Sequence, residues 1–144
     1  MNTIVTKALI GIVCLVFLFS CSSSRRSIAI EEGWELLGER KVGFVRDKDE
    51  FTVTSRNLFT AIRFKVEDKD IHLNYLKIYF DNGDKLEPSI DDNITAGQDS
   101  RIIELSRDGR YISKIEFKYR STGSILEGRA NVLVFGRKFD RYRY

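Results

Sequence analysis

The chain has 144 residues, with 24 Lys and Arg against 21 Asp and Glu, and it contains one His and two Cys. This length allows one domain with one hydrophobic core, and 42% hydrophobic with 31% charged residues excludes disordered and collagen-like chains. So few His and Cys cannot build most metal centres or nucleophilic active sites. We therefore expect no metal, no cofactor and no enzyme activity.

Residues 1–20 have the pattern of a secretory signal. Lys7 supplies a positive charge, and Ala8 to Phe19 is an apolar run interrupted by one glycine. As a helix these twelve residues reach about 18 Å, which is short of the roughly 30 Å hydrocarbon core of a membrane. The segment is therefore predicted to be a cleaved signal peptide and not a spanning helix.

A cysteine follows the predicted signal directly. Leu18, Ser20 and Cys21, followed by three serines, resemble the lipobox of bacterial lipoproteins, in which the cysteine is acylated and becomes the first residue; Phe19 is bulkier than is usual there. The alternative is an ordinary cysteine at a cleavage boundary. We expect lipidation of Cys21, a tether over residues 21–33, and anchoring to a membrane of the bacterial envelope, the periplasmic face of the outer membrane in a Gram-negative source.

The rest of the chain alternates apolar and polar residues with a period of two, which predicts strands and no helix. The region Trp34 to Val45 is expected to hold one or two strands, with Trp34 closing the core. A change of parity predicts a β-bulge near Asn74, and Pro88 indicates an edge strand. The other expected strands are Phe51–Thr54, Thr60–Val66, Ile71–Phe80, Lys85–Ile90, Arg101–Leu105, Tyr111–Arg120 and Ala130–Phe135.

Turn signals separate these strands. The pair Asn82-Gly83 predicts a type I′ hairpin turn, and residues 91–100 are expected to be the longest loop. Seven to nine short strands predict a single antiparallel β-sandwich over residues 34–136, either jelly-roll or immunoglobulin-like, with a small closed barrel as the alternative.

Positive charge is concentrated at the two ends of the chain. Residues 27–136 contain 17 basic and 20 acidic residues, whereas the aromatic tail 137–144 is basic. We expect this tail to be solvated, to form an edge strand, or to contact lipid phosphates. Nucleic acid is not expected as a partner of an exported protein.

Five short segments stand in a recognisable order: Leu36-Leu37-Gly38, Asn82-Gly83, Gly97 to Leu105, Phe117 to Ser121, and Gly128-Arg129-Ala130. Together they resemble a family of small exported bacterial proteins known only as a domain of unknown function. The resemblance covers about residues 34–136. It implies an all-β exported domain and carries no activity or catalytic residue.

The candidate ligand-binding residues are Tyr75, Lys77 and Tyr79, which project from one face of a long strand. Flat aromatic rings beside cations suit an acidic glycan or a protein partner, and the alternative is that these side chains only pack across strands. His72 lacks a predicted catalytic partner. Acidic pairs such as Asp91 and Asp92 could hold calcium but lack the spacing of a dedicated calcium loop.

The sequence therefore predicts a membrane-anchored lipoprotein with a non-catalytic sandwich that binds an envelope protein or glycan. The alternatives are an accessory subunit of an envelope complex, with the tail as its contact, and a calcium-dependent hydrolase.

Overall fold

The computed structural model of the chain describes residues 28–43, 47–121 and 128–142. The predicted signal peptide, Cys21 and the tether up to residue 27 lie outside the described residues. The described part contains nine strands and no helix, and so no helix that could cross a membrane. The strands are β1 (Trp34–Val42), β2 (Asp47–Thr52), β3 (Phe59–Glu67), β4 (Ile71–Phe80), β5 (Lys85–Leu86), β6 (Asp92–Ile94), β7 (Ile103–Glu104), β8 (Ile112–Ser121) and β9 (Ala130–Lys138).

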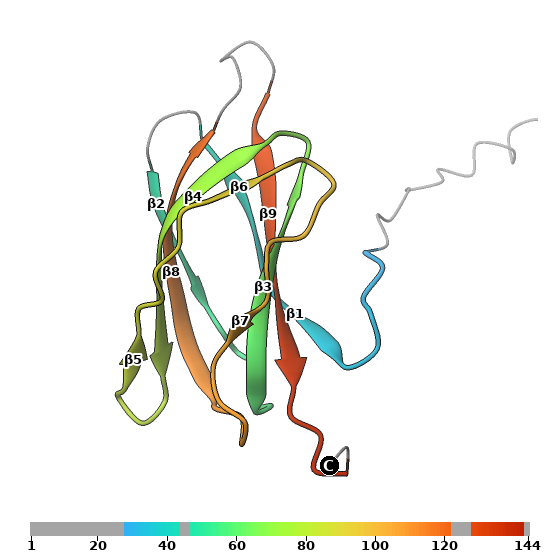
Figure 1. Cartoon of the computed structure of the whole chain (residues 1–144), viewed down its shortest axis with the longest axis vertical. Coiled ribbons are helices and arrows are strands. Elements are labelled where there is room, and N and C mark those ends of the chain that lie inside the picture. The colour runs from blue at the N-terminus through green and yellow to red at the C-terminus, as the bar shows by residue number, and fades with distance from the viewer. Residues whose placement is uncertain (1–27, 44–46, 122–127, 143–144) are drawn as a thin grey trace, which may run out of the picture.

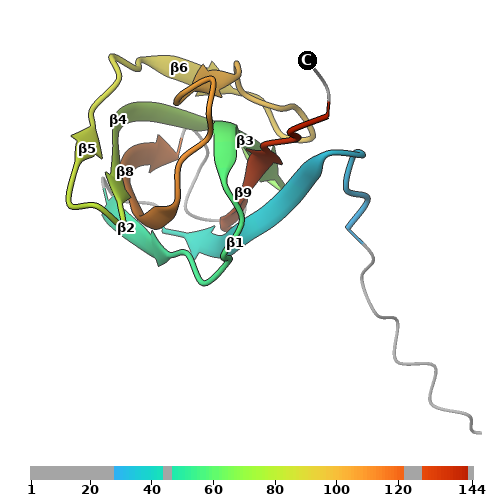
Figure 2. The ribbon, with the colours of Figure 1, turned by 90° about the horizontal axis from the view of Figure 1, so that it is seen from below.

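The strands form two antiparallel sheets that face each other (Figures 1 and 2). Sheet A has the order β1-β9-β3-β7, and sheet B has the order β2-β8-β4-β5, with β6 paired to β4. The first four strands pair in reverse order with later ones: β1 with β9, β2 with β8, β3 with β7, and β4 with β5. This is the winding of a jelly roll, one of the two sandwich topologies predicted from the sequence.

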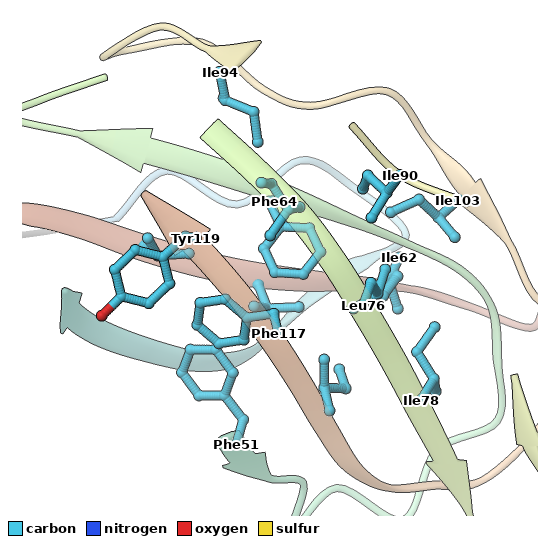
Figure 3. Packing of buried hydrophobic residues seen from close by; sticks show 14 of the residues in the cluster. Phe51, Ile62, Phe64, Leu76, Ile78, Ile90, Ile94, Ile103, Phe117 and Tyr119 are labelled. Atoms are coloured by element: carbon cyan, nitrogen blue, oxygen red, sulfur yellow. The ribbon is translucent and has the colours of Figure 1, made fainter. Parts of the chain in front are cut away.

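The core lies between the sheets and is centred on aromatic rings (Figure 3). Phe51 and Phe117 stack with ring centroids 5.3 Å apart, and Phe64 and Tyr119 pack at 5.7 and 5.6 Å from Phe117. Burying each such side chain contributes about 1.5–3 kcal/mol. The hydroxyl of the buried Tyr119 donates to Asp49 at 2.7 Å and so keeps its polar end hydrogen-bonded.

Trp34 is buried, but the expectation that it closes the core is wrong. It packs with Leu133 and Phe135 in a second cluster on the outer face of sheet A. Alternation along β9 explains this, because Val132 and Val134 already fill the inner face and direct their neighbours outward.

The bulge predicted near Asn74 is present, since the pairing of β4 with β8 shifts between Leu73 and Tyr75. The type I′ prediction for the following turn is wrong, because Gly83 alone in that turn has a positive φ, 86°. The Gly83 N–H donates to the Phe80 carbonyl at 3.0 Å, and the Asn82 side chain accepts from the Asp84 N–H at 3.1 Å. The asparagine therefore stabilises the turn through its side chain and does not need the left-handed conformation.

Several strands differ from those expected: β2 covers Asp47–Thr52 and not Phe51–Thr54, and β7 is shortened to Ile103–Glu104. The strand expected at 85–90 ends at Leu86, two residues before Pro88. The expected long loop instead contains β6, whose Ile94 is buried opposite Ile71 on β4. Strand β9 continues to Lys138, beyond the expected domain end at residue 136, and is a central strand and not an edge.

Candidate functional site

Tyr75, Lys77 and Tyr79 lie on the outer face of sheet B, in the middle of β4. They alternate with the buried Leu76 and Ile78, so all three point away from the core and are half-buried. Alternation along β4 from Tyr75 to Phe80, after the bulge at Asn74, produces this arrangement, as the sequence pattern predicted.

Two neighbouring strands complete this surface. On β8, Lys118, Glu116 and Lys114 stand directly opposite Tyr75, Lys77 and Tyr79, and β2 adds Lys48 and Glu50 beside β8. We call this surface the lysine–tyrosine face, and its members are Lys48, Glu50, Tyr75, Lys77, Tyr79, Lys114, Glu116 and Lys118.

Lysine ammonium groups lie over both tyrosine rings. The Nζ of Lys114 is 4.5 Å from the centroid of Tyr79, and the Nζ of Lys118 is 4.9 Å from that of Tyr75. Such cation–π contacts contribute about 0.5–1 kcal/mol at exposed sites. They hold the rings and the lysine stems in one layer across the two strands.

Ion pairs on the face differ in burial. Lys48 pairs with Glu116 at 3.0 Å, and the Glu116 side chain is only 8% exposed. Lys77 pairs with Glu87 at 3.4 Å and Lys114 with Glu50 at 3.3 Å, and these two carboxylates are 51% and 58% exposed. Exposed pairs contribute little to stability, so Lys114 can exchange Glu50 for a ligand at small cost, whereas the Lys77 side chain is only 18% exposed.

Proton affinities follow from this geometry. Burial of Glu116 opposes ionisation, but the hydrogen bond and charge of Lys48 outweigh it and lower the pKa of Glu116. The same hydrogen bond raises the pKa of Lys48, and the hydrogen bond to Glu87 raises that of Lys77. Desolvation, followed by the bond to Glu87, raises the pKa of Tyr75. The ammonium groups of Lys48 and Lys77 therefore stay charged at neutral pH.

Arg63 and Lys65 do not border this face, because β3 lies in sheet A. On the outer side of that sheet, the Arg63 guanidinium lies 4.2 Å from the Trp34 ring and 5.8 Å from Phe135. It also pairs with Glu31 at 2.9 Å, and Ile28 packs on the same cluster. Residues 28–33 are therefore held against the outer face of sheet A, a contact that sequence reasoning missed because it joins segments distant in sequence.

His72 and the pair Asp91 and Asp92 lie near the start of β4, next to β6 and before the bulge that precedes Tyr75. The ring nitrogens of His72 lie 2.7 Å from the side-chain oxygens of Asn93 and Asp91, which ties β4 to the segment around β6. Asp92 of the same segment pairs with Arg101 at 3.0 Å. Within the described ranges, no group of three or more His, Cys, Asp or Glu side chains could hold a metal ion.

The sequence profile of a family described as Domain of unknown function (DUF2541) matches residues 11–136. The chain belongs to the DUF2541 family. This confirms the family resemblance inferred from the sequence. No curated protein matches the chain. Among solved structures, AlgX from Pseudomonas aeruginosa has a TM-score of 0.45 and 16% identity, over 82% of this chain and 28% of AlgX, so the chain spans less than a third of that protein.

The segment Gly97 to Leu105, one of the five that carried the family resemblance, has a clear structural role. The Ser100 hydroxyl accepts from the N–H of Phe64 on β3 at 2.9 Å. Asp99 pairs with Arg63 on the same strand at 3.5 Å. Arg101 donates to Asp92 and to the Ser89 carbonyl, at the edge of the other sheet. Asp99, Ser100 and Arg101 therefore attach the long 87–102 connection to both sheets. This structural role accounts for these three residues without a catalytic or binding role.

Proposed function

We propose that this DUF2541 chain is a lipoprotein of the bacterial cell envelope, anchored through Cys21, whose non-catalytic sandwich binds an acidic glycan on the lysine–tyrosine face. The observation that carries the proposal is the alignment of Tyr75, Lys77 and Tyr79 beside Lys114 and Lys118 on one broad sheet face.

The two outer faces of the sandwich are used differently. The outer face of sheet A carries residues 28–33, held by the Trp34 cluster and Arg63. The lysine–tyrosine face carries no such segment from among the described residues. A domain tethered by its N-terminal segment therefore has the face of sheet B available for a ligand.

The spacing of cations on this face suits a polymer. Residues two apart on a strand are separated by about 7 Å, so Lys114 and Lys118 lie about 13 Å apart, with Lys77 on the neighbouring strand between them. A chain with a repeating negative charge can contact several of these ammonium groups at once, whereas a small ligand can contact one. Lys118 makes no ion pair with a carboxylate in the described part of the chain.

The binding test uses the mature chain from Ser22 and an acidic polysaccharide with one carboxylate on each sugar. We expect binding that weakens with salt and that falls at least tenfold in the triple variant Tyr75→Ala, Lys77→Ala, Tyr79→Ala. The carboxyl-reduced polysaccharide should not bind.

The matched control removes two tyrosines and one lysine elsewhere, as Tyr111→Ala, Tyr142→Ala and Lys65→Ala, and should bind as the wild type does. Equal loss in both triple variants, or equal binding of the reduced polysaccharide, would exclude the lysine–tyrosine face as the glycan site. Capture of an envelope protein that the first triple variant alone loses would assign the face to a protein partner instead.

Anchoring is tested separately in cells. The wild type should incorporate labelled palmitate and fractionate with membranes, and Cys21→Ala should lose both properties. A Cys21→Ala chain that is still acylated would contradict the assignment of Cys21.

A further inference from the structure

The chain enters and leaves the sandwich at one place. The N–H of Lys138, the last residue of β9, donates to the Gly33 carbonyl at 2.8 Å. Residues 32–33 and 138–142 line one surface hollow. The end of β9 and the tail that follows it lie at the lower end of the ribbon in Figure 1. The N–H of Phe139 donates to the Leu58 carbonyl at 2.8 Å, which fixes the start of the tail against the sandwich.

The distance from this place to the proposed anchor is limited by the covalent chain. Cys21 and Ile28 are seven residues apart, and a fully extended chain covers at most about 25 Å over that interval. Ile28 packs on the Trp34 cluster, so that side of sheet A stays within this distance of the lipid headgroups.

We propose, on the basis of the lipid anchor in the proposed function, that Lys138, Arg141 and Tyr142 contact anionic phospholipid headgroups of the membrane that holds Cys21. The Tyr142 side chain is 94% exposed, and Lys138 and Arg141 are exposed beside it. Basic side chains near an anionic membrane surface bind it, and tyrosine favours the interface between lipid and water.

Two acidic residues, Asp140 and Glu32, lie beside Lys138 and Arg141. The Asp140 carboxylate keeps its charge and accepts the Tyr142 N–H at 2.9 Å within the tail. In the sequence, Arg25 and Arg26 lie between Glu32 and Cys21 and add two positive charges on the side of the proposed anchor. The contact would turn sheet A towards the membrane and leave the lysine–tyrosine face pointing away from it.

The test uses the lipidated chain in vesicles that contain phosphatidylcholine with or without 30% phosphatidylglycerol and a headgroup-labelled quenching lipid. A fluorescent probe is placed on Tyr142→Cys or, as the control, on Lys85→Cys at the edge of sheet B. The thioether-linked Cys21 does not react with the probe, and Cys14 leaves with the signal peptide.

We expect the probe at position 142 to be quenched at least threefold more than the probe at position 85, and only when phosphatidylglycerol is present. Adding Lys138→Ala and Arg141→Ala should remove this difference. Equal quenching at both positions, or quenching at position 142 that ignores the anionic lipid, would overturn the proposal.

Vesicle flotation distinguishes a missing lipid anchor from a missing tail contact. A chain that does not float would show that the anchor is absent, and with it this contact. A chain that floats with an unquenched tail would overturn the contact alone and leave the anchor and the glycan site standing.

Discussion

At the scale of single residues, two close contacts explain glycines that no turn requires. Gly38 lies at the bulge of β1, where the pairing with β9 shifts between Leu36 and Gly38. A Cβ atom at Gly38 would lie against the Phe51 ring, 2.9 Å from both Cε1 and Cγ. At Gly136 a Cβ atom would lie 2.5 Å from the Phe59 ring. Both rings belong to other strands, so sequence alone could not predict either requirement.

We expect Gly38→Ala to lower the free energy of unfolding by about 1–3 kcal/mol, because the added methyl group must displace the Phe51 ring in a packed core. Urea denaturation measures the change. The double variant Gly38→Ala, Phe51→Leu should show a smaller effect of the alanine than the single variant does, since leucine vacates the ring position. An unchanged denaturation midpoint in Gly38→Ala would contradict this packing argument.

At the scale of strands and segments, the sequence predicted the features that depend only on the alternation of apolar and polar residues along one strand. β4 alternates on either side of its bulge at Asn74 and β8 alternates from Ile115 onwards, so their existence, their buried faces and the shared face of Tyr75, Lys77 and Tyr79 were predictable. The short β6 was not, because it depends on pairing with β4. The packing of residues 28–33 on sheet A also depends on distant partners, above all Arg63 on β3.

We expect Arg63→Ala to loosen residues 28–33, because it removes the Glu31 ion pair and the cation that stacks on Trp34. The cost should be about 1–2 kcal/mol, since the Arg63 side chain is largely buried. Trp34 is the only tryptophan in the chain, so a red shift of its emission reports its exposure directly. Lys65→Ala, two residues along the same strand face, should leave the emission unchanged, and an unshifted Arg63→Ala spectrum would count against the role given to Arg63.

At the scale of the whole molecule, the sandwich was predictable but its winding was not. The jelly-roll topology depends on pairing β1 with β9 and β2 with β8, strands from opposite ends of the chain. Alternation indicates that each strand has one face to bury and does not indicate its partner. For the same reason the sequence alone does not indicate that Lys114 and Lys118 lie beside Tyr79 and Tyr75, or that Arg63 and Lys65 lie in the other sheet.

The stability of the whole domain should depend on pH through Glu116. Its pKa is lowered from the ordinary value of 4.5 in the folded state, so the unfolded state binds the proton more tightly. The stabilisation by the Lys48 pair is therefore present above pH 4.5 and is lost as the pH falls below that value.

Unfolding free energies between pH 7 and pH 3 measure this dependence. We expect Glu116→Gln to be less stable than the wild type at pH 7 and to lose less stability on acidification. Glu50→Gln, which removes an exposed carboxylate, should titrate nearly as the wild type does. Parallel pH profiles for wild type and Glu116→Gln would contradict the assignment.

The hydrogen bond between Lys138 and Gly33 also indicates how the chain can be circularly permuted. It joins the two ends of the described domain, while the exposed turn at Asp68, with a φ of 70°, lies where β3 ends, beyond the Glu67–Asn131 pair and at the opposite end of the sandwich. A circular permutant with a short linker between residues 142 and 28 and new termini at Asp68 would keep every strand pairing. Its free ends would then project from the far end, where a tag or a fused domain stays clear of both residues 28–33 and the tail.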